Sequence, residues 1–272
     1  MLSPEQLAAS SIPRHLLDNA GEMRLSMHLG KGSVGAAIAD VAEGKLQWFH
    51  HERFQADSDW NDMVQTLRFR NWKEATFRKI SISFDCEACT LVPAGFYEAS
   101  RADELLSVLY RNQASGEART TDISLFAAKL LFRIPQELLE MASWFQHARI
   151  YPSMHPLLAR HFEGSVKQAV LQLTGNYMLL RITEGKKLLF CNFFSVHHDE
   201  DVLYFLANAC MNLAIDMGGL QLFTEGIEPQ SALMLQLSNY CNPVLSNPVI
   251  NLQGKTENTS IVNLTLQNFL CE

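Results

Sequence analysis

Hydrophobic and polar positions alternate with a period of two in several stretches of the chain, and this pattern predicts β-strands. The N-terminal half begins with three such stretches, at 25–29, 34–38 and 46–54, which are separated by glycine-containing turns. This spacing predicts an antiparallel meander of three strands. Asp57-Ser58-Asp59 then supplies a helix start, so we expect the meander to lead into an amphipathic helix.

The same order of patterns returns in the second half of the chain. Strands are predicted at 169–173, 177–183 and 187–196, and the acidic stretch 198–201 opens an apolar helix. Because five elements recur in one order, the sequence predicts an internal duplication. Three pairs of positions match at separations of 145, 141 and 139 residues: Gly30 with Gly175, Gly44 with Gly185, and Asp62 with Asp201.

The remaining stretches are less regular. Residues 79–84 and 129–134 alternate as strands do, whereas the polar stretch 112–121 is typical of a loop. We expect the tail at 261–270 to pair as an edge strand. With 272 residues and roughly 150 residues per domain, the chain divides into four predicted parts: a polar leader at 1–23, a first lobe at 24–151, a second lobe at 152–250 and a C-terminal extension at 251–272.

Composition and charge exclude several classes of protein. Hydrophobic residues make up 47% of the chain, which is too many for an intrinsically disordered protein. The net charge is −7 and the densest basic stretch, at 68–79, is interrupted by Glu74, so neither nucleic acid nor a membrane surface is an expected partner. No apolar window of about 18 residues and no secretion signal is present, and a cytoplasmic location is therefore expected.

Cysteine and histidine patterns do not indicate a metal centre. Cys86 and Cys89 form a Cys-Xaa-Xaa-Cys motif, but a second pair that would complete a zinc site is missing. His50-His51 and His197-His198 each follow the third strand of a half. Neighbouring residues on a strand point to opposite faces, so we favour a role at the helix entry over a metal site that His198 would share with Asp199 and Asp201.

Several segments carry a resemblance to a known family. They are Arg24-Leu25-Ser26, the run at 89–93, the run at 133–138, Tyr151-Pro152-Ser153 before the run at 156–158, the run Glu184–Phe194 and the run at 200–205. Over about residues 24–248 the chain resembles a bacterial domain-of-unknown-function family with an actin-like ATPase fold. The resemblance implies an α/β architecture of two ribonuclease H-like lobes related by internal duplication, each with a mixed sheet flanked by helices.

The resemblance also implies where a ligand would bind. Actin-like ATPases hold phosphates in two facing hairpins, each with an Asp-Xaa-Gly motif whose carboxylate organises magnesium. Gly30 and Leu173 stand where this chain would need those acids, so neither motif is complete. Lys31 is left as an alternative phosphate partner. The candidate ligand-binding residues of this degenerate site are Gly30, Lys31, Gly32, Ser33, Thr174, Gly175, Asn176, Glu225 and Gly226.

Two functions remain open from the sequence. The first is a non-catalytic protein-interaction or assembly module without a cofactor, whose partner is an unknown protein or a second copy. The alternative is an ATP-binding protein or weak ATPase with nucleotide in the interlobe cleft. Bulky side chains such as Tyr177 and Phe194 would exclude a nucleotide if they fill that cleft.

Overall fold

The structure is a computed structural model. It describes residues 11–30, 32–40, 42–43, 45–54, 59–111, 115–160, 166–245 and 264–270. Lys31 and Gly44 lie outside these residues, as do residues 1–10 of the predicted leader and residues 251–263 and 271–272 of the predicted extension.

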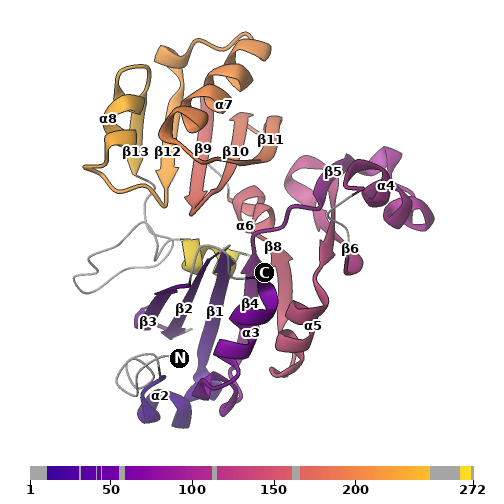
Figure 1. Ribbon diagram of the computed structural model, residues 1–272, viewed down its shortest axis with the longest axis vertical. Coiled ribbons are helices and arrows are strands. Elements are labelled where there is room, and N and C mark those ends of the chain that lie inside the picture. Colours follow the sequence, from indigo (N-terminus) through magenta and orange to yellow (C-terminus); the bar gives the residue numbers. More distant parts are fainter. Residues whose placement is uncertain are drawn as a thin grey trace.

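A five-stranded mixed sheet forms the centre of the first lobe (Figure 1). Its first three strands pair antiparallel, and the last two join β1 in parallel. The predicted meander is therefore confirmed. In spatial order the strands are β3 (Leu46–Arg53), β2 (Ser33–Asp40), β1 (Met23–Gly30), β4 (Lys79–Phe84) and β8 (Arg149–Pro152).

The second lobe has a sheet with the same order and the same strand directions. The first hairpin of each lobe begins at equivalent positions. Both of its strands start 144 residues later in the second lobe, at Lys167 and Tyr177, than in the first lobe, at Met23 and Ser33. Gly30 therefore corresponds to Thr174, and the match with Gly175 inferred from the sequence is wrong by one residue. The strands are β11 (Lys187–Ser195), β10 (Tyr177–Glu184), β9 (Lys167–Thr174), β12 (Gln221–Glu225) and β13 (Asn242–Leu245).

Helix starts also correspond between the lobes. Asp59 caps its helix by accepting a hydrogen bond from the backbone N–H of Asp62 at 2.9 Å. His198 caps the equivalent helix, and Asp201 completes a capping box. The predicted match of Asp62 with Asp201 is confirmed, since each is the third residue of its helix. The α-helices outside the small subdomain are α2 (Arg14–Asp18), α3 (Trp60–Leu67), α5 (Gln136–Ser143), α6 (Met154–Ala159), α7 (Asp199–Asn212) and α8 (Ala232–Ser238).

None of the helices within the described residues is long and apolar enough to cross a membrane.

Short 3-10 turns connect several elements: η1 (Ala20–Glu22), η2 (Asn71–Lys73), η3 (Ala94–Phe96), η4 (Ala99–Arg101), η5 (Ser124–Phe126), η6 (Met217–Gly219) and η7 (Gln267–Leu270).

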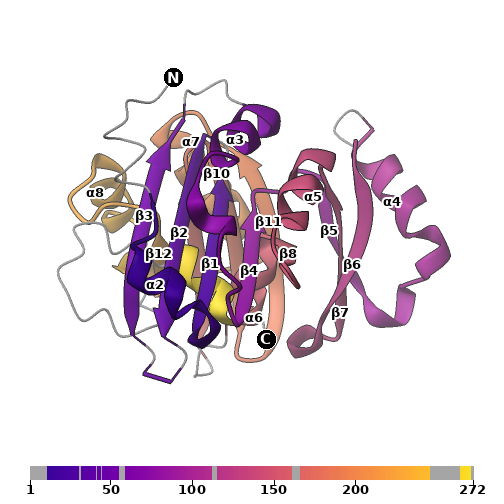
Figure 2. The same ribbon diagram turned by 90° about the horizontal axis from the view of Figure 1, so that it is seen from below.

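A small subdomain projects from the first lobe (Figure 2). Its three strands pair antiparallel in the order β5 (Cys89–Pro93), β7 (Ala128–Ile134) and β6 (Glu117–Ile123), and α4 (Ala102–Leu109) covers one face. The loop predicted at 112–121 is thus wrong from Glu117 onward. The physical reason is that β6 is an edge strand in which Ile123 alone is fully buried, so its composition resembles that of a loop.

The tail also differs from its prediction. Residues 264–270 form helical turns and not an edge strand. Alternation of Leu264 and Leu266 with polar residues imitates a strand, but both sides of the segment are buried. An alternation of apolar and polar residues indicates a strand where one face is buried and the other is solvated. This segment is buried on all sides, so its alternation does not indicate a strand.

Two hydrophobic clusters stabilise the fold. One lies between the second sheet and helices α7 and α8. The other centres on β1, β2 and β4, and it extends into the second sheet at Val170, Tyr177 and Leu179. The two lobes therefore pack against each other through apolar side chains.

Candidate functional site in the interlobe cleft

The cleft between the two sheets holds the chain's own C-terminal segment, which we define as Leu264–Asn268 (Figure 1). All five side chains of this segment are between 0% and 3% exposed. The turn η7, which begins at Gln267 within this segment, contacts β1, β4 and α6. The segment that the sequence resemblance does not cover therefore occupies the centre of the molecule.

Hydrogen bonds attach the C-terminal segment to the first lobe. Ser26 Oγ donates to the backbone carbonyl of Thr265. Asn268 Nδ2 donates to the carbonyl of Met27 at 2.6 Å. Gly35 on the neighbouring strand allows this close approach, since a Cβ atom there would lie 2.2 Å from Thr265 Oγ1. The segment is thus fitted to the backbone of β1 and β2.

The second lobe binds the same segment through an acidic side chain. Gln267 Nε2 donates to the Glu225 carboxylate, which also pairs with Arg160. Burial lowers the pKa of Arg160 to about 10, and the guanidinium therefore stays charged at neutral pH. Glu225, a predicted site residue, is fully buried and acts as the anchor of the segment.

Gly226 completes the second wall of the cleft. Its φ angle is +74°, and a Cβ atom would lie 1.9 Å from the carbonyl oxygen of Leu173 and 3.3 Å from Leu264 Cδ1. Glycine is required here for its backbone conformation and for the approach of Leu264. This predicted site residue therefore contacts the C-terminal segment.

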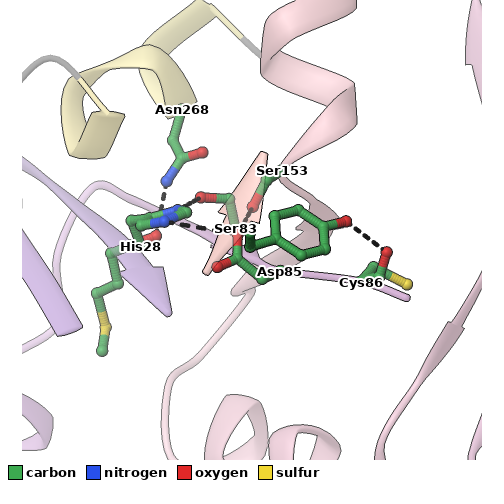
Figure 3. Close-up of polar contacts among 8 residues, drawn as sticks. His28, Ser83, Asp85, Cys86, Ser153 and Asn268 are labelled. Atoms are coloured by element: carbon green, nitrogen blue, oxygen red, sulfur yellow. Dashed lines mark hydrogen bonds and ion pairs between the residues drawn. The ribbon is translucent and has the colours of Figure 1, made fainter. Parts of the chain in front are cut away.

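A buried polar network lies beneath the segment on the first lobe (Figure 3). His28 Nδ1 is hydrogen-bonded to Ser83 Oγ at 3.0 Å, and His28 Nε2 lies 3.8 Å from Asp85 Oδ1. Ser153 Oγ donates to the same Asp85 oxygen at 3.0 Å. Burial, followed by the nearby His51, lowers the pKa of His28 to about 4, so its imidazole is neutral at physiological pH.

This network has the residue types of a nucleophile, a base and an acid, but not their geometry. A separation of 3.8 Å is too long for a hydrogen bond between His28 and Asp85. Ser83 is fully buried, and a substrate cannot reach its hydroxyl. The geometry therefore indicates a structural role, in which the network supports the strand ends beneath the cleft.

The two hairpins meet directly across the cleft. A Cβ atom at Gly30 would lie 2.5 Å from Thr174 Cγ2, 2.8 Å from Ser33 Oγ and 3.2 Å from Asp85 Oδ2. An aspartate at position 30 does not fit while Thr174 keeps its place. The buried carboxylate beside this hairpin is Asp85, which follows β4 and not β1.

A cavity of about 260 Å³ remains between the hairpins and the C-terminal segment. Five residues of the predicted site line it: Gly32, Ser33, Thr174, Gly175 and Gly226. Its volume is smaller than the roughly 300–1,000 Å³ of ordinary ligand pockets. Leu264 and Thr265 of the C-terminal segment form part of its wall.

Polar and basic groups nevertheless line this cavity. His28 Nε2, Thr174 Oγ1 and Thr265 Oγ1 are buried without a hydrogen-bond partner. His51 and Arg53 add basic side chains from β3. Burial and the Arg53 charge lower the pKa of His51, so we expect Arg53 to be the main source of positive charge.

The other predicted residues lie apart from this cavity. Asn176 is exposed in its turn, where its carbonyl accepts a hydrogen bond from the N–H of Val196 at 2.9 Å. Tyr177 does not fill the cleft, because its hydroxyl donates to the carbonyl of Cys86 at 2.6 Å. Phe194 stacks on Phe205 within the second lobe. The C-terminal segment, and not Tyr177 or Phe194, occupies the space between the lobes.

Sequence reasoning missed Asp85, Ser153 and the C-terminal segment. Asp85 carried a usable signal, since it is an acid that directly follows the predicted strand 79–84. Ser153 lies in a segment that carries the family resemblance, but no local pattern indicates its contact with Asp85, because the two residues are 68 positions apart. Within the described part of the chain, no group of three or more histidine, cysteine, aspartate or glutamate side chains is arranged to hold a metal ion.

Solved structures with the same fold confirm the architecture. A Bacteroides thetaiotaomicron VPI-5482 protein, described as having an actin-like ATPase fold and unknown function, is similar with a TM-score of 0.77 and 15% identity over 94% of this chain and 98% of that chain. The PilM-PilN type IV pilus biogenesis complex contains a chain that is similar with a TM-score of 0.53 and 12% identity, over 92% of this chain and 98% of that chain. None of the curated proteins that were compared matches the sequence.

A family model agrees with the fold. The family described as "Protein of unknown function (DUF3822)" matches residues 14–244, which include both five-stranded sheets except for the last residue of β13. The C-terminal segment lies beyond the matched region. Because the match spans most of the chain and the solved structures share its architecture, we conclude that the protein belongs to the DUF3822 family and has an actin-like ATPase fold.

Proposed function

We propose that the chain is a non-catalytic protein-interaction module whose interlobe cleft binds a protein segment. The observation that carries this proposal is the complete burial of Leu264–Asn268 between the lobes. A cleft that already encloses five residues of peptide has the dimensions and the hydrogen-bonding groups that a peptide ligand requires. The PilM-PilN complex offers a precedent for protein interaction by a chain of this fold.

The chemistry of the cleft favours peptide over nucleotide. The groups that meet the C-terminal segment include the Met27 carbonyl and the Glu225 carboxylate. Both accept hydrogen bonds, and a carboxylate repels phosphate. They suit the N–H groups of amide side chains, whereas a polyphosphate needs donors and cations.

The hairpins lack the acids that the family resemblance assigns to magnesium binding. Gly30 has no room for a carboxylate beside Thr174. Leu173 is an apolar residue on the cavity wall. We therefore derive no hydrolytic step for this site.

Calorimetry with ATP and Mg²⁺ on the full chain tests the proposal, together with an assay for released phosphate. We expect neither micromolar binding nor hydrolysis. Micromolar binding that Thr174→Val weakens at least 10-fold would overturn the proposal, because Thr174 lines the cavity. Thr121→Val, in the small subdomain, is the matched control and is expected to change nothing.

ATP binding after release of the C-terminal segment is the second candidate function. It is favoured by the cavity beside the hairpins, with its unpartnered polar atoms and the Arg53 side chain. The same titration on a full-length Leu266→Asp variant distinguishes the two functions. ATP binding that appears only in this variant supports the second candidate, and no binding in either protein excludes it.

Self-association is a specific form of the interaction function. Light scattering of the full chain over a wide range of concentrations measures it directly. A mass that rises with concentration supports assembly, whereas a strictly monomeric mass leaves a different protein as the partner.

A further inference from the structure

The C-terminal segment makes the contacts that a bound peptide makes. Leu264 contacts the second lobe at Gly226, while Thr265 contacts the first lobe at Gly35 and Ser26. Gln267 and Asn268 then bind opposite walls, at Glu225 and at the Met27 carbonyl respectively. Two apolar side chains and two side-chain amides thus define what the cleft recognises.

We propose that the cleft is a peptide-binding groove in which Leu264–Asn268 is an intramolecular competitor. The external partner is a protein segment with the same chemical pattern, which is two leucines separated by one residue and followed by two side-chain amides. The proposal rests on the proposed function and adds both the ligand class and its regulation. An external segment enters only when the C-terminal segment leaves.

Three side-chain oxygens of the docked segment lack hydrogen bonds, and this makes its exchange for another segment feasible. Thr265 Oγ1, Gln267 Oε1 and Asn268 Oδ1 are all buried without a hydrogen-bond partner. No group within the described residues pairs with these three oxygens, and buried polar atoms without a protein partner weaken the docking of the segment. An external segment whose side chains at these positions find better partners in the cleft therefore competes with it.

Steric fit explains why the groove is specific. Gly35 and Gly226 provide room that any other residue would fill. The carboxylate of Glu225 requires a donor at the position of Gln267. A segment with an acidic side chain in that place would bring two carboxylates together in a buried site, and the cleft excludes it.

A fluorescent peptide of residues 261–270 tests the competition when it is titrated into full-length proteins. In the wild type we expect weak binding, since a tethered competitor has an effective concentration on the order of millimolar. Leu266→Asp places a charge at a fully buried position and releases the segment. We expect this variant to bind the peptide at least 10-fold more tightly than the wild type does.

Leu235→Asp is the matched control, because it makes the same substitution on the exposed face of α8. It is expected to bind the peptide as the wild type does. A peptide in which the residue equivalent to Asn268 is alanine lacks the bond to Met27 and is expected to bind about 10-fold more weakly to Leu266→Asp. Equal binding of the peptide by all three proteins would overturn the proposal.

A reversible disulfide provides a second test that does not depend on the stability of Leu266→Asp. An ideal Cβ at Gly35 lies 3.5 Å from Thr265 Cβ, within the range of about 3.5–4.5 Å for a disulfide. In the double variant Gly35→Cys/Thr265→Cys, the peptide used has alanine at the position of Thr265, so that no hydroxyl meets the Cβ atom at position 35. Oxidation is expected to lock the segment and abolish binding of this peptide, and reduction is expected to restore it. Wild type treated in the same way controls for the native cysteines.

Electrophoresis without reductant shows which molecule supplies the segment. A monomeric cross-linked product supports the intramolecular competitor, and a cross-linked dimer overturns it in favour of exchange between copies. Unchanged peptide affinity after reduction of the locked protein also overturns the proposal. Such failures leave the non-catalytic part of the proposed function standing, because the assays for ATP binding and phosphate release decide that part and peptide binding does not.

Discussion

Individual glycines control how closely the parts of this molecule approach. At Gly30 and Gly35, strand residues without side chains face Thr174 and Thr265, at distances that a Cβ atom would reduce to 2.5 Å and 2.2 Å. Gly95, by contrast, has nothing within 4 Å of its Cβ position. The sequence shows fourteen glycines without distinguishing those that are required from those that are tolerated.

Gly35→Val is expected to displace the C-terminal segment. The branched side chain reaches both Thr265 Oγ1 and the Thr265 Cβ atom, which lies 3.5 Å from the Cβ position, so rotation of the threonine does not relieve the contact. Hydrogen–deuterium exchange of residues 264–268 should become at least 10-fold faster. Gly95→Val is the control, and equal exchange in the two variants would contradict the role of Gly35.

The lowered pKa of His28 predicts how the stability of the protein changes at acidic pH. Its pKa is about 6.5 when unfolded and about 4 when folded, because burial opposes the charged form. The unfolded chain therefore binds a proton between pH 6.5 and pH 4 that the folded chain does not. Stability is full above this window and falls as pH falls through it, by about 2 kcal/mol between pH 7.5 and pH 5 for this residue.

Urea unfolding of His28→Asn at pH 7.5 and pH 5 measures this effect. The difference between the two free energies of unfolding is expected to shrink by about 2 kcal/mol relative to the wild type. The variant retains some acid sensitivity, because burial also lowers the pKa of His155 to about 4. An undiminished difference between the two pH values would show that His28 does not cause it.

Elements of the small subdomain depend on one buried cation. Arg133 on β7 pairs with the Asp103 carboxylate at 2.7 Å and donates to Ser107 Oγ at 2.8 Å, both on α4. Its guanidinium also reaches the Gly116 carbonyl beside β6 at 3.3 Å. One side chain therefore joins the helix to both strands.

Arg133→Met is expected to loosen α4 from its sheet. The substitution retains apolar volume and leaves the three acceptors without their donor, which costs about 2 kcal/mol of stability. Exchange of the amides of α4 should accelerate, while those of α7 remain protected. Arg101→Met is the control, because the ion pair of Arg101 with Glu104 is exposed and is expected to contribute less than about 0.5 kcal/mol.

At the scale of the whole molecule, the lobes are joined by apolar contacts and by Tyr177. Tyr177 packs in the cluster of the first lobe although it begins β10 of the second. Its ring stacks on Phe193, and burial raises the pKa of its phenol well above the usual value. The hydroxyl therefore stays protonated and donates a hydrogen bond to the Cys86 carbonyl across the interface between the lobes.

Scanning calorimetry is expected to show one cooperative transition for the full chain, because a single cluster spans both lobes. Tyr177→Phe leaves the buried Cys86 carbonyl without its donor and should lower stability by about 2 kcal/mol. The transition midpoint is then expected to fall by roughly 5 °C. Tyr204→Phe, on an exposed face of α7, should leave it unchanged, and two separate transitions in the wild type would contradict the shared core.

Local patterns in the sequence were sufficient for the hairpins, the helix starts and the repeated order of elements. Strand alternation and caps such as Asp59 arise from contacts within a few residues, and the printed sequence contains them directly. An edge strand such as β6 was misread because its solvated faces remove the alternation. Whether the repeated order reflects duplication stays a prediction.

The sequence by itself determined the fold class, and it placed Gly30 and Leu173 at the positions where the family resemblance expects acids. Only the tertiary structure decided what fills the interlobe cleft. Thr265 and Ser26 lie 239 positions apart, and no local propensity encodes a contact across such a separation. Leu264–Asn268 has a strand-like alternation, but in helical turns its leucines are buried between two lobes and the N–H groups of its two side-chain amides find acceptors. Packing and long-range hydrogen bonding therefore override the local pattern.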